Sequence, residues 1–289
     1  MDADRLYRWI VEVFEKDGIF EESSFSKIPK EDTEHVRFLL DYLVSKSLIK
    51  AETVGNKTRY TPQDLVKIKQ LMGYEKEHER KTEKLDESLV VSIPLSLTND
   101  LSSLINKYKD IKVVELKDVL KSLIASASKE ILIASPFMEP DGIMYILDEI
   151  SAAAKRGVSI KIISRDILVK KNYDFSYLDK IKGISKLYTL YEQNKINPGT
   201  TISIRDYGTN ISQYSGTSTH YEGIHQKMVI VDRKSAYIGS GEIRAASFIT
   251  NGEAGGLFVG RQAEFWSDFF ELFWKEAKEI PKELIESKI

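Results

Sequence analysis

Residues 225–242 read HQKMVIVDRKSAYIGSGE, and this stretch decides the fold. Two short apolar runs, 228–231 and 236–238, flank a polar turn, which predicts two adjacent strands of a hairpin. Side chains of a strand alternate between faces, so His225 and Lys227 point to the same face of the incoming strand. An imidazole and an ammonium on one face form an anion site. Such a pair suits phosphoryl transfer, in which an imidazole attacks phosphorus while fixed cations stabilise the oxygens.

The spacing within this stretch closely resembles the HKD motif of the phospholipase D superfamily, HxKxxxxDxxxxxxGSxN. The matching residues are His225, Lys227, Asp232, Gly239 and Ser240. Two other segments are similar to the family: the apolar ILIASPFM at 131–138, and the sequence NGE at 251–253 ahead of an expected strand. The resemblance covers roughly residues 112–280.

The resemblance implies a role for each site residue. His225 would be the nucleophile that forms a phosphohistidine, and Lys227 would hold the non-bridging oxygens. Ser240 would donate a hydrogen bond to the phosphate. Asp232 would support the local loop or pair with a cation, and Glu253 would orient or tune His225.

The resemblance also implies how the site is assembled. No metal and no cofactor are expected. Family members with a single motif build their site from two copies, which implies a homodimer. The second His225 of that homodimer would protonate the leaving oxygen.

Glu242 stands where the motif has Asn. An Asn side chain can donate a hydrogen bond to an anion, whereas an ionised Glu only accepts and would repel a phosphate at close range. Three outcomes are open: Glu242 turns away, it pairs with Lys227 or Arg244, or the site has lost or altered its activity.

The sequence before the motif alternates between helical and strand patterns. Apolar strands are expected at 130–135 and 158–164, with helices at 116–127 and 144–156, and a further helix follows the motif at 261–278. Such alternation predicts a mixed or parallel sheet with helices on its faces. The expected fold class is therefore α/β, a phospholipase D-like mixed sheet flanked by helices, with a smaller amino-terminal winged-helix domain.

The amino-terminal pattern is that of three helices followed by a hairpin. Helices are expected at 4–15, near 25–28 and from 32 or 33 to 45, and two strands flank the turn Gly55-Asn56-Lys57. This order resembles winged helix-turn-helix domains. The expected organisation is a winged-helix domain at 1–62, a charged helical linker at 63–88 and a phospholipase D-like catalytic domain at 89–289. His35 and His78 are expected at the surface, and His220 in a loop.

Candidate nucleic-acid contacts lie at the end of the third helix and on the hairpin: Lys46, Lys50, Lys57 and Arg59. The third helix itself begins with acidic residues, EDTEH, where phosphate contacts would need cations. Protein recognition by this module therefore stays open beside DNA binding. The expected partner is nucleic acid, with DNA preferred over RNA.

The composition of the chain excludes several kinds of functional site. The chain has 289 residues, a formal net charge of −2 and no cysteine, which excludes disulfides, thiolate zinc sites and cysteine nucleophiles. No apolar run is long enough to span a bilayer and the start is not a secretion signal, so no membrane partner and a cytoplasmic location are expected. The aromatic run at 265–274 favours core or dimer packing over base stacking.

Three functions follow from these features. The first is a metal-independent phosphodiesterase, a nuclease acting on DNA or RNA. The second is a non-catalytic regulator, because archaeal sugar-responsive regulators of the TrmB type also join a winged helix to a phospholipase D-like ligand-sensing domain. Glu242 favours this second reading. The third, a lipid phosphodiesterase, lacks a membrane-seeking basic amphipathic helix in the sequence.

Overall fold

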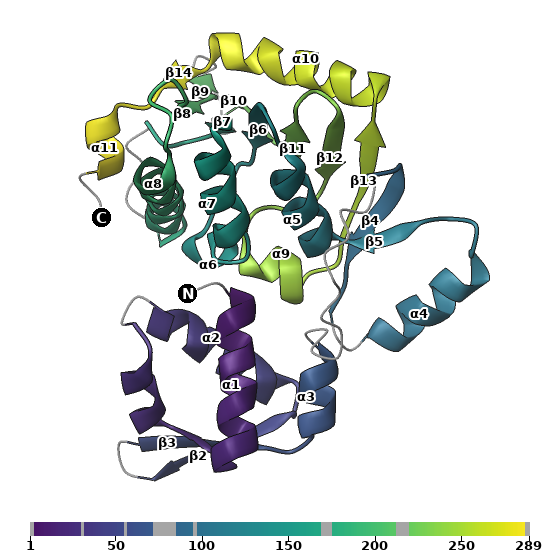
Figure 1. Cartoon of the computed structure of the whole chain (residues 1–289), viewed down its shortest axis with the longest axis vertical. Helices are drawn as coiled ribbons and strands as arrows, with labels where there is room; N and C mark the ends of the chain where they lie inside the picture. Colours follow the sequence, from purple (N-terminus) through teal and green to yellow (C-terminus); the bar gives the residue numbers. More distant parts are fainter. Residues whose placement is uncertain are drawn as a thin grey trace. The chain divides into compact units, whose positions relative to one another are not determined.

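The computed structural model describes residues 3–29, 32–54, 57–71, 85–94, 97–168, 175–211 and 220–286. The chain divides into two compact units, Met1–Lys81 and Thr82–Ile289. Figure 1 labels the helices and strands of both units.

The first unit is a small helical domain with an antiparallel sheet. Its elements are α1 (Ala3–Asp17), β1 (Phe20–Glu21), the 3₁₀ helix η1 (Glu22–Lys27), α2 (Thr33–Ser45), β2 (Ile49–Val54), β3 (Lys57–Pro62) and α3 (Leu65–Leu71). The strands pair in the order β1-β3-β2. Apolar residues of α1 and α2 at three- and four-residue spacing form its core, among them Leu6, Ile10, Leu39 and Leu43, each at most 1% exposed. This arrangement is compatible with a winged helix.

His35 was expected at the surface, and this is wrong: it is only 4% exposed, on the flank of the buried stripe of α2. The expected charged helix begins as α3 and is followed by 72–84, which lie outside the described residues, as does His78. Residues 85–87 are not helical, and the next strand starts at Ser88.

The second unit is built on a mixed sheet, in which nine strands are described in the order β14-β8-β7-β6-β11-β12-β13-β4-β5. In chain order these are β4 (Ser88–Ser92), β5 (Val113–Glu115), β6 (Glu130–Ala134), β7 (Ser159–Ser164), β8 (Ile202–Asp206), β11 (Lys227–Val231), β12 (Ser235–Gly239), β13 (Glu253–Val259) and β14 (Lys278–Glu279). Parallel pairing holds β6, β7 and β8 together, while β11, β12 and β13 pair antiparallel.

The helices of this unit are α4 (Thr98–Lys107), α5 (Leu116–Ser126), α6 (Pro140–Ile143), α7 (Leu147–Arg156), α8 (Phe175–Asn194), α9 (Ala245–Ile249), α10 (Arg261–Glu276) and α11 (Lys282–Glu286). Helices α5, α7 and α8 lie on one face of the sheet and α10 crosses the other (Figure 1). Because side chains alternate between the two faces of β11, Val229 packs toward α5 on one face and Ile230 toward α10 on the other.

A separate two-stranded sheet, β9 (Gly208–Ile211) with β10 (His220–Gly223), lies just before the motif. The expectation that His220 lies in a loop is therefore wrong, because His220 begins the strand β10. Residues 212–219 lie outside the described part of the chain.

The strand directions place one set of strand ends together. The carboxyl ends of β6, β7, β8 and β12 meet the amino ends of β11 and β13 at one edge of the sheet. In open α/β sheets, ligands bind at the carboxyl ends of the parallel strands. This edge is therefore where a site is expected, and the motif residues His225 and Lys227 lie on it.

Candidate active site

His225 and Lys227 lie together at the amino end of β11. His225 is exposed and immediately precedes the strand, while Lys227 is its first residue and is buried. The Lys227 Nζ donates a hydrogen bond to the His225 carbonyl oxygen at 2.9 Å and lies 3.4 Å from each ring nitrogen. An accessible imidazole thus lies directly beside a buried ammonium, and such a pair can support phosphoryl transfer.

Glu242 faces this ammonium. Its Oε1 lies 3.5 Å from the Lys227 Nζ, and its Oε2 lies 3.6 Å from Nη1 of Arg244. Glu242 is only 8% exposed, and its backbone N–H donates to the Ser247 hydroxyl at 3.2 Å. Of the three outcomes open from sequence, the structure shows pairing, with Lys227 and Arg244 at once. The positive charge of Lys227 is therefore balanced by a carboxylate of the same chain.

Ser240 and Glu253 form a second connected pair at this edge. The Ser240 hydroxyl donates to Glu253 Oε2 at 2.6 Å and accepts the N–H of Ala254 at 3.1 Å. The other carboxylate oxygen of Glu253 accepts from Ser247 at 2.8 Å and from Asn251 at 3.4 Å. Among the described contacts none joins Glu253 to His225. Glu253 holds the turn that carries Ser240, so a hydrogen bond from Ser240 to phosphate requires its hydroxyl to leave Glu253.

Asp232 lies at the opposite edge of the sheet. It follows the last residue of β11, roughly 16 Å along the strand from Lys227 at about 3.3 Å per residue. Its carboxylate accepts hydrogen bonds from the backbone N–H groups of Ser128, Lys129 and Glu130 at 2.7–3.0 Å and from the Ser128 hydroxyl at 2.7 Å. Asp232 therefore fastens the start of β6 to the end of β11 and does not contact a group held at His225.

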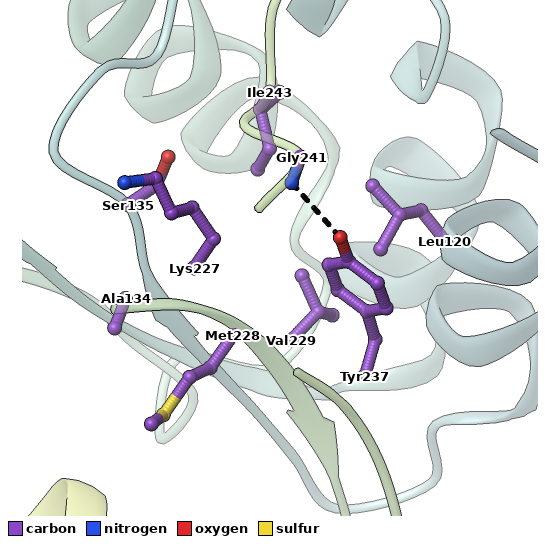
Figure 2. A pocket seen from close by; sticks show the side chains of 9 residues that line it. All are labelled: Leu120, Ala134, Ser135, Lys227, Met228, Val229, Tyr237, Gly241 and Ile243. Carbon is purple, nitrogen blue, oxygen red and sulfur yellow. Dashed lines mark hydrogen bonds between the residues drawn. The ribbon is translucent and has the colours of Figure 1, made fainter. Parts of the chain in front are cut away.

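A small pocket lies beneath Lys227. Its lining includes Ser135, Lys227, Tyr237 and Gly241, and its volume of about 10 Å³ leaves room for about one water molecule. Figure 2 shows Lys227 and Tyr237 on the same side of the sheet, with the Tyr237 hydroxyl accepting the Gly241 N–H at 3.0 Å. Tyr237 thus fixes the turn that leads to Glu242.

Three further side chains near this edge lie outside the HKD motif, although Phe137 belongs to the family-like segment 131–138. Phe137 and Arg165 follow the carboxyl ends of β6 and β7, and Lys180 comes from α8. A polar or aromatic residue directly after a predicted parallel strand is a signal that could have found the first two. No comparable local signal marks Lys180.

The candidate nucleic-acid contacts of the first unit are Lys46, Lys50, Lys57 and Arg59. Lys50 pairs with Glu52 at 2.7 Å and Arg59 with Glu21 at 2.7 Å. Lys46 caps α2 with its Nζ 5.7 Å from the Tyr42 ring centre, and Lys57 is exposed at the start of β3. Two of the four charges are thus already matched by acidic neighbours, which limits the positive potential of the hairpin.

Within the described ranges, no group of three or more His, Cys, Asp or Glu side chains is placed to hold a metal ion. None of the described helices combines the length and the hydrophobicity that a membrane span requires.

The chain is similar in sequence to one known protein family. The family model for the "Cardiolipin synthase, PLD-like domain" matches residues 120–275, more than half of the chain. This chain belongs to the phospholipase D-like family. The match runs from α5 to α10 and includes His225, Lys227, Ser240 and Glu253. No curated protein sequence matches the chain.

Solved structures similar to this phospholipase D-like chain include Nuc, NucT and an archaeal chromatin protein. Nuc from Salmonella typhimurium, a phospholipase D family member, is 19% identical over 68% of this chain and 99% of its own, with a TM-score of 0.41. NucT from Helicobacter pylori is 19% identical over 68% and 99%, with a TM-score of 0.40. TrmBL2, described as an archaeal chromatin protein with a novel mode of DNA binding, is 16% identical over 96% and 94%, with a TM-score of 0.35.

Proposed function

We propose that this protein is a metal-independent phosphodiesterase that cleaves nucleic acid, with DNA preferred over RNA. The observation that carries the proposal is the contact between His225 and Lys227, 3.4 Å apart, at the ligand-binding edge of a phospholipase D-like sheet. His225 is exposed and can reach a phosphate, while Lys227 is held in place beside it.

In the proposed reaction a ring nitrogen of His225 attacks phosphorus and displaces one ester oxygen. The departing oxygen takes a proton from the second His225 of a homodimer, and a phosphohistidine remains. Water then gives a proton to the second His225, which became neutral in the first step, attacks the phosphohistidine, breaks the P–N bond and gives a phosphate monoester. Lys227 stabilises the non-bridging oxygens in both steps, which requires the phosphate to compete with Glu242 for the ammonium.

The proposed domain roles follow the division of the chain. Residues 1–62 act as a winged helix that binds nucleic acid through Lys46, Lys50, Lys57 and Arg59, 63–88 connect, and 89–289 carry the phosphodiesterase. Ion pairs on the hairpin favour backbone contacts of modest strength, because Lys50 and Arg59 must exchange acidic partners for phosphates.

The test is incubation of the full chain with labelled single- and double-stranded oligonucleotides in EDTA. Wild type is compared with His225→Ala, Lys227→Ala and the control Lys234→Ala, an exposed lysine at the other end of the same hairpin. We expect cleavage by wild type and Lys234→Ala, and a loss of at least about a hundredfold in the other two. Undiminished cleavage by folded His225→Ala would remove the assignment. Phosphatidylcholine in a parallel assay tests the lipid alternative.

A second candidate is a non-catalytic, ligand-responsive transcription regulator. The observation that favours it is the buried contact of Glu242 with Lys227, which leaves the ammonium already paired. This candidate predicts that the protein shifts duplex DNA in a manner that depends on a small ligand and cuts no oligonucleotide. It also predicts that Glu242→Asn does not create cleavage.

A further inference from the structure

Three cationic side chains surround one aromatic ring beside the proposed reaction site. Lys180 Nζ lies 4.5 Å from the centre of the Phe137 ring, and the guanidinium carbons of Arg165 and Arg244 lie 5.8 and 5.9 Å from it. The Phe137 cluster consists of Phe137, Arg165, Lys180 and Arg244. Their elements are far apart in sequence, so the fold brings these charges together.

The backbone that carries Arg165 is fixed by two buried charged residues. Lys180, 3% exposed, donates its Nζ to the Arg165 carbonyl oxygen at 2.7 Å. Asp206, 4% exposed, accepts the N–H groups of Ile167 at 3.0 Å and Leu168 at 2.7 Å. Burial of two charged groups is unfavourable unless they form hydrogen bonds, and here all three hydrogen bonds are made with the backbone of the segment after β7.

The pKa directions of these two groups agree with their burial. Burial lowers the pKa of Lys180 most strongly, against the opposing effect of Asp166. Burial raises the pKa of Asp206, against the hydrogen bonds from Leu168 and Ile167. Burial therefore disfavours the charged form of both groups. Their hydrogen bonds nevertheless fix the backbone at and after Arg165.

Gly183 allows a close approach that the cluster needs, and Gly223 lies in ordinary contact distance of Arg165. A Cβ on Gly183 would lie 2.0 Å from the Met138 carbonyl oxygen, so only glycine lets α8 pack this closely after Phe137 and bring in Lys180. A Cβ on Gly223 would lie 3.6 Å from Cδ of Arg165. Gly223 is two residues before His225, so the Arg165 side chain passes beside the segment that leads to the proposed nucleophile.

The guanidinium of Arg165 has unused hydrogen-bonding capacity. Its ion pair with Asp166 is long, at 3.8 Å, and its buried Nε has no hydrogen-bond partner among the described residues. Arg244 is tied to Glu139 at 3.0 Å and to Glu242 at 3.6 Å, but its Nε likewise lacks a described partner. Arginine presents five donors in a planar fork that matches phosphate oxygens, so these two forks can still accept an anion.

Arg244 also joins the cluster to the site. Glu242 contacts Arg244 through one oxygen and Lys227 through the other. A phosphate held by Lys227 would therefore lie near Arg244, which belongs to the Phe137 cluster.

We infer that Arg165 and Arg244 form a second phosphate position, which receives the backbone phosphate adjoining the one held at His225 and Lys227. This inference rests on the proposed function and names its substrate class more narrowly: a strand with at least two consecutive phosphodiesters. Phe137 offers an apolar face for the sugar or base between the two phosphates. A substrate with one phosphodiester fills only half of the site.

The test compares thymidine dinucleotide, with one internal phosphate, and thymidine trinucleotide, with two. Binding is measured by calorimetry at several salt concentrations in full-length His225→Ala protein, so that neither ligand is consumed. In the His225→Ala protein with Arg165 intact, we expect the trinucleotide to bind about tenfold more tightly than the dinucleotide. Addition of Arg165→Ala should remove that advantage and reduce the salt slope for the trinucleotide by about 0.7, the contribution of one phosphate contact in a single strand.

The matched control is Arg233→Ala, which removes an arginine from the opposite edge, where it pairs with Asp268 at 2.6 Å. It should keep the full difference between the ligands. Arg165→Lys should recover part of the difference, since it keeps the charge and loses the fork. Melting temperatures of all variants are compared, and Arg165→Lys serves as the decisive variant if Arg165→Ala is not folded.

The outcomes separate this inference from the proposed function. Equal affinity for the two ligands in the Arg165-containing protein, or an Arg165→Ala variant that keeps the difference, overturns the second phosphate position even if wild type cleaves DNA. In another outcome, the trinucleotide binds more tightly than the dinucleotide only when Arg165 is present, in a protein that cleaves no nucleic acid. That outcome supports the second phosphate position and contradicts the proposed phosphodiesterase activity.

Discussion

The Nζ atom of Lys227 lies 3.5 Å from Oε1 of Glu242, and the two side chains are 11% and 10% exposed. Because little water reaches the pair, its attraction is screened less than that of a surface ion pair. Any phosphate bound by Lys227 competes with this carboxylate. Glu242 therefore controls how strongly the site holds an anion.

Replacement of Glu242 by Gln should strengthen anion binding. Removal of the competing charge is expected to increase affinity for inorganic phosphate at least about tenfold, or about 1.4 kcal/mol. Calorimetric titration with phosphate measures it. Glu139→Gln is the control, because Glu139 pairs with Arg244 at 3.0 Å and has no described contact with Lys227. Equal gains in the two variants would show that Arg244, and not Lys227, sets the affinity.

Replacement of Asp232 by Ala should destabilise the fold by about 2–4 kcal/mol, because charge-assisted hydrogen bonds to three backbone N–H groups and a hydroxyl are lost. Urea denaturation gives the value. Asp268→Ala, which removes an exposed ion pair with Arg233, should cost less than about 1 kcal/mol. A comparable loss in both variants would contradict the clamp assigned to Asp232.

The same carboxylate predicts an acid-dependent loss of stability. Burial raises the pKa of Asp232, but hydrogen bonds from Ser128, Glu130 and Lys129 outweigh it and hold the pKa below its usual range. The folded state thus favours the ionised form, so the contribution is complete above the unfolded pKa of about 3.9 and is lost as the pH falls through the folded value. Unfolding free energies between about pH 6 and pH 3 should fall more steeply in wild type than in Asp232→Ala.

Replacement of Tyr237 by Phe should cost about 1–3 kcal/mol, because the buried N–H of Gly241 loses its acceptor. Tyr108→Phe, at a residue that is 44% exposed, is the control and should change stability little.

Burial also raises the pKa of Tyr237 to about 12. The neutral form is favoured in the folded state, so its contribution is present below the unfolded pKa of about 10 and is lost as the pH rises toward 12. An alkaline loss of stability that is the same in Tyr237→Phe would exclude this residue as a source.

Replacement of Gly183 by Ala should loosen α8 and cost about 1–3 kcal/mol, since its Cβ would overlap the Met138 carbonyl oxygen. Gly252→Ala is the matched control, because a Cβ there meets no atom within 4 Å. Thermal denaturation compares the two. An unchanged melting temperature in Gly183→Ala would mean that α8 does not need this close approach.

The parts of the fold that the sequence predicts are those with local, one-sided patterns. The motif hairpin and α5 have clear periodicity and are found where it places them, within one or two residues. Helix α8 is not predicted, because it packs against α6, α7 and α11, and its buried residues do not form a single narrow stripe. His35 is misplaced for a related reason: the buried face of α2 includes His35 and Tyr42 as well as four aliphatic residues.

The site shows the same limit at the level of charges. Spacing along one strand brings His225 and Lys227 together, because that contact depends only on alternation. The partner of Lys227 lies across the sheet edge, so sequence leaves three outcomes open for Glu242. Arg165 and Lys180 are further away still, and their convergence on Phe137 depends on the packing of α8, which no local pattern encodes.

The clamp at Asp232 changes what agreement with the motif means. Within one short stretch, the residue at one end of β11 ties two strands together, whereas at the other end the exposed His225 and the buried Lys227 form the candidate site. Selection for folding alone can therefore preserve Asp232 after chemistry has been lost or altered. In chains of this kind the retained aspartate reports on architecture, whereas the position occupied by Glu242 is the more informative guide to whether bonds are broken.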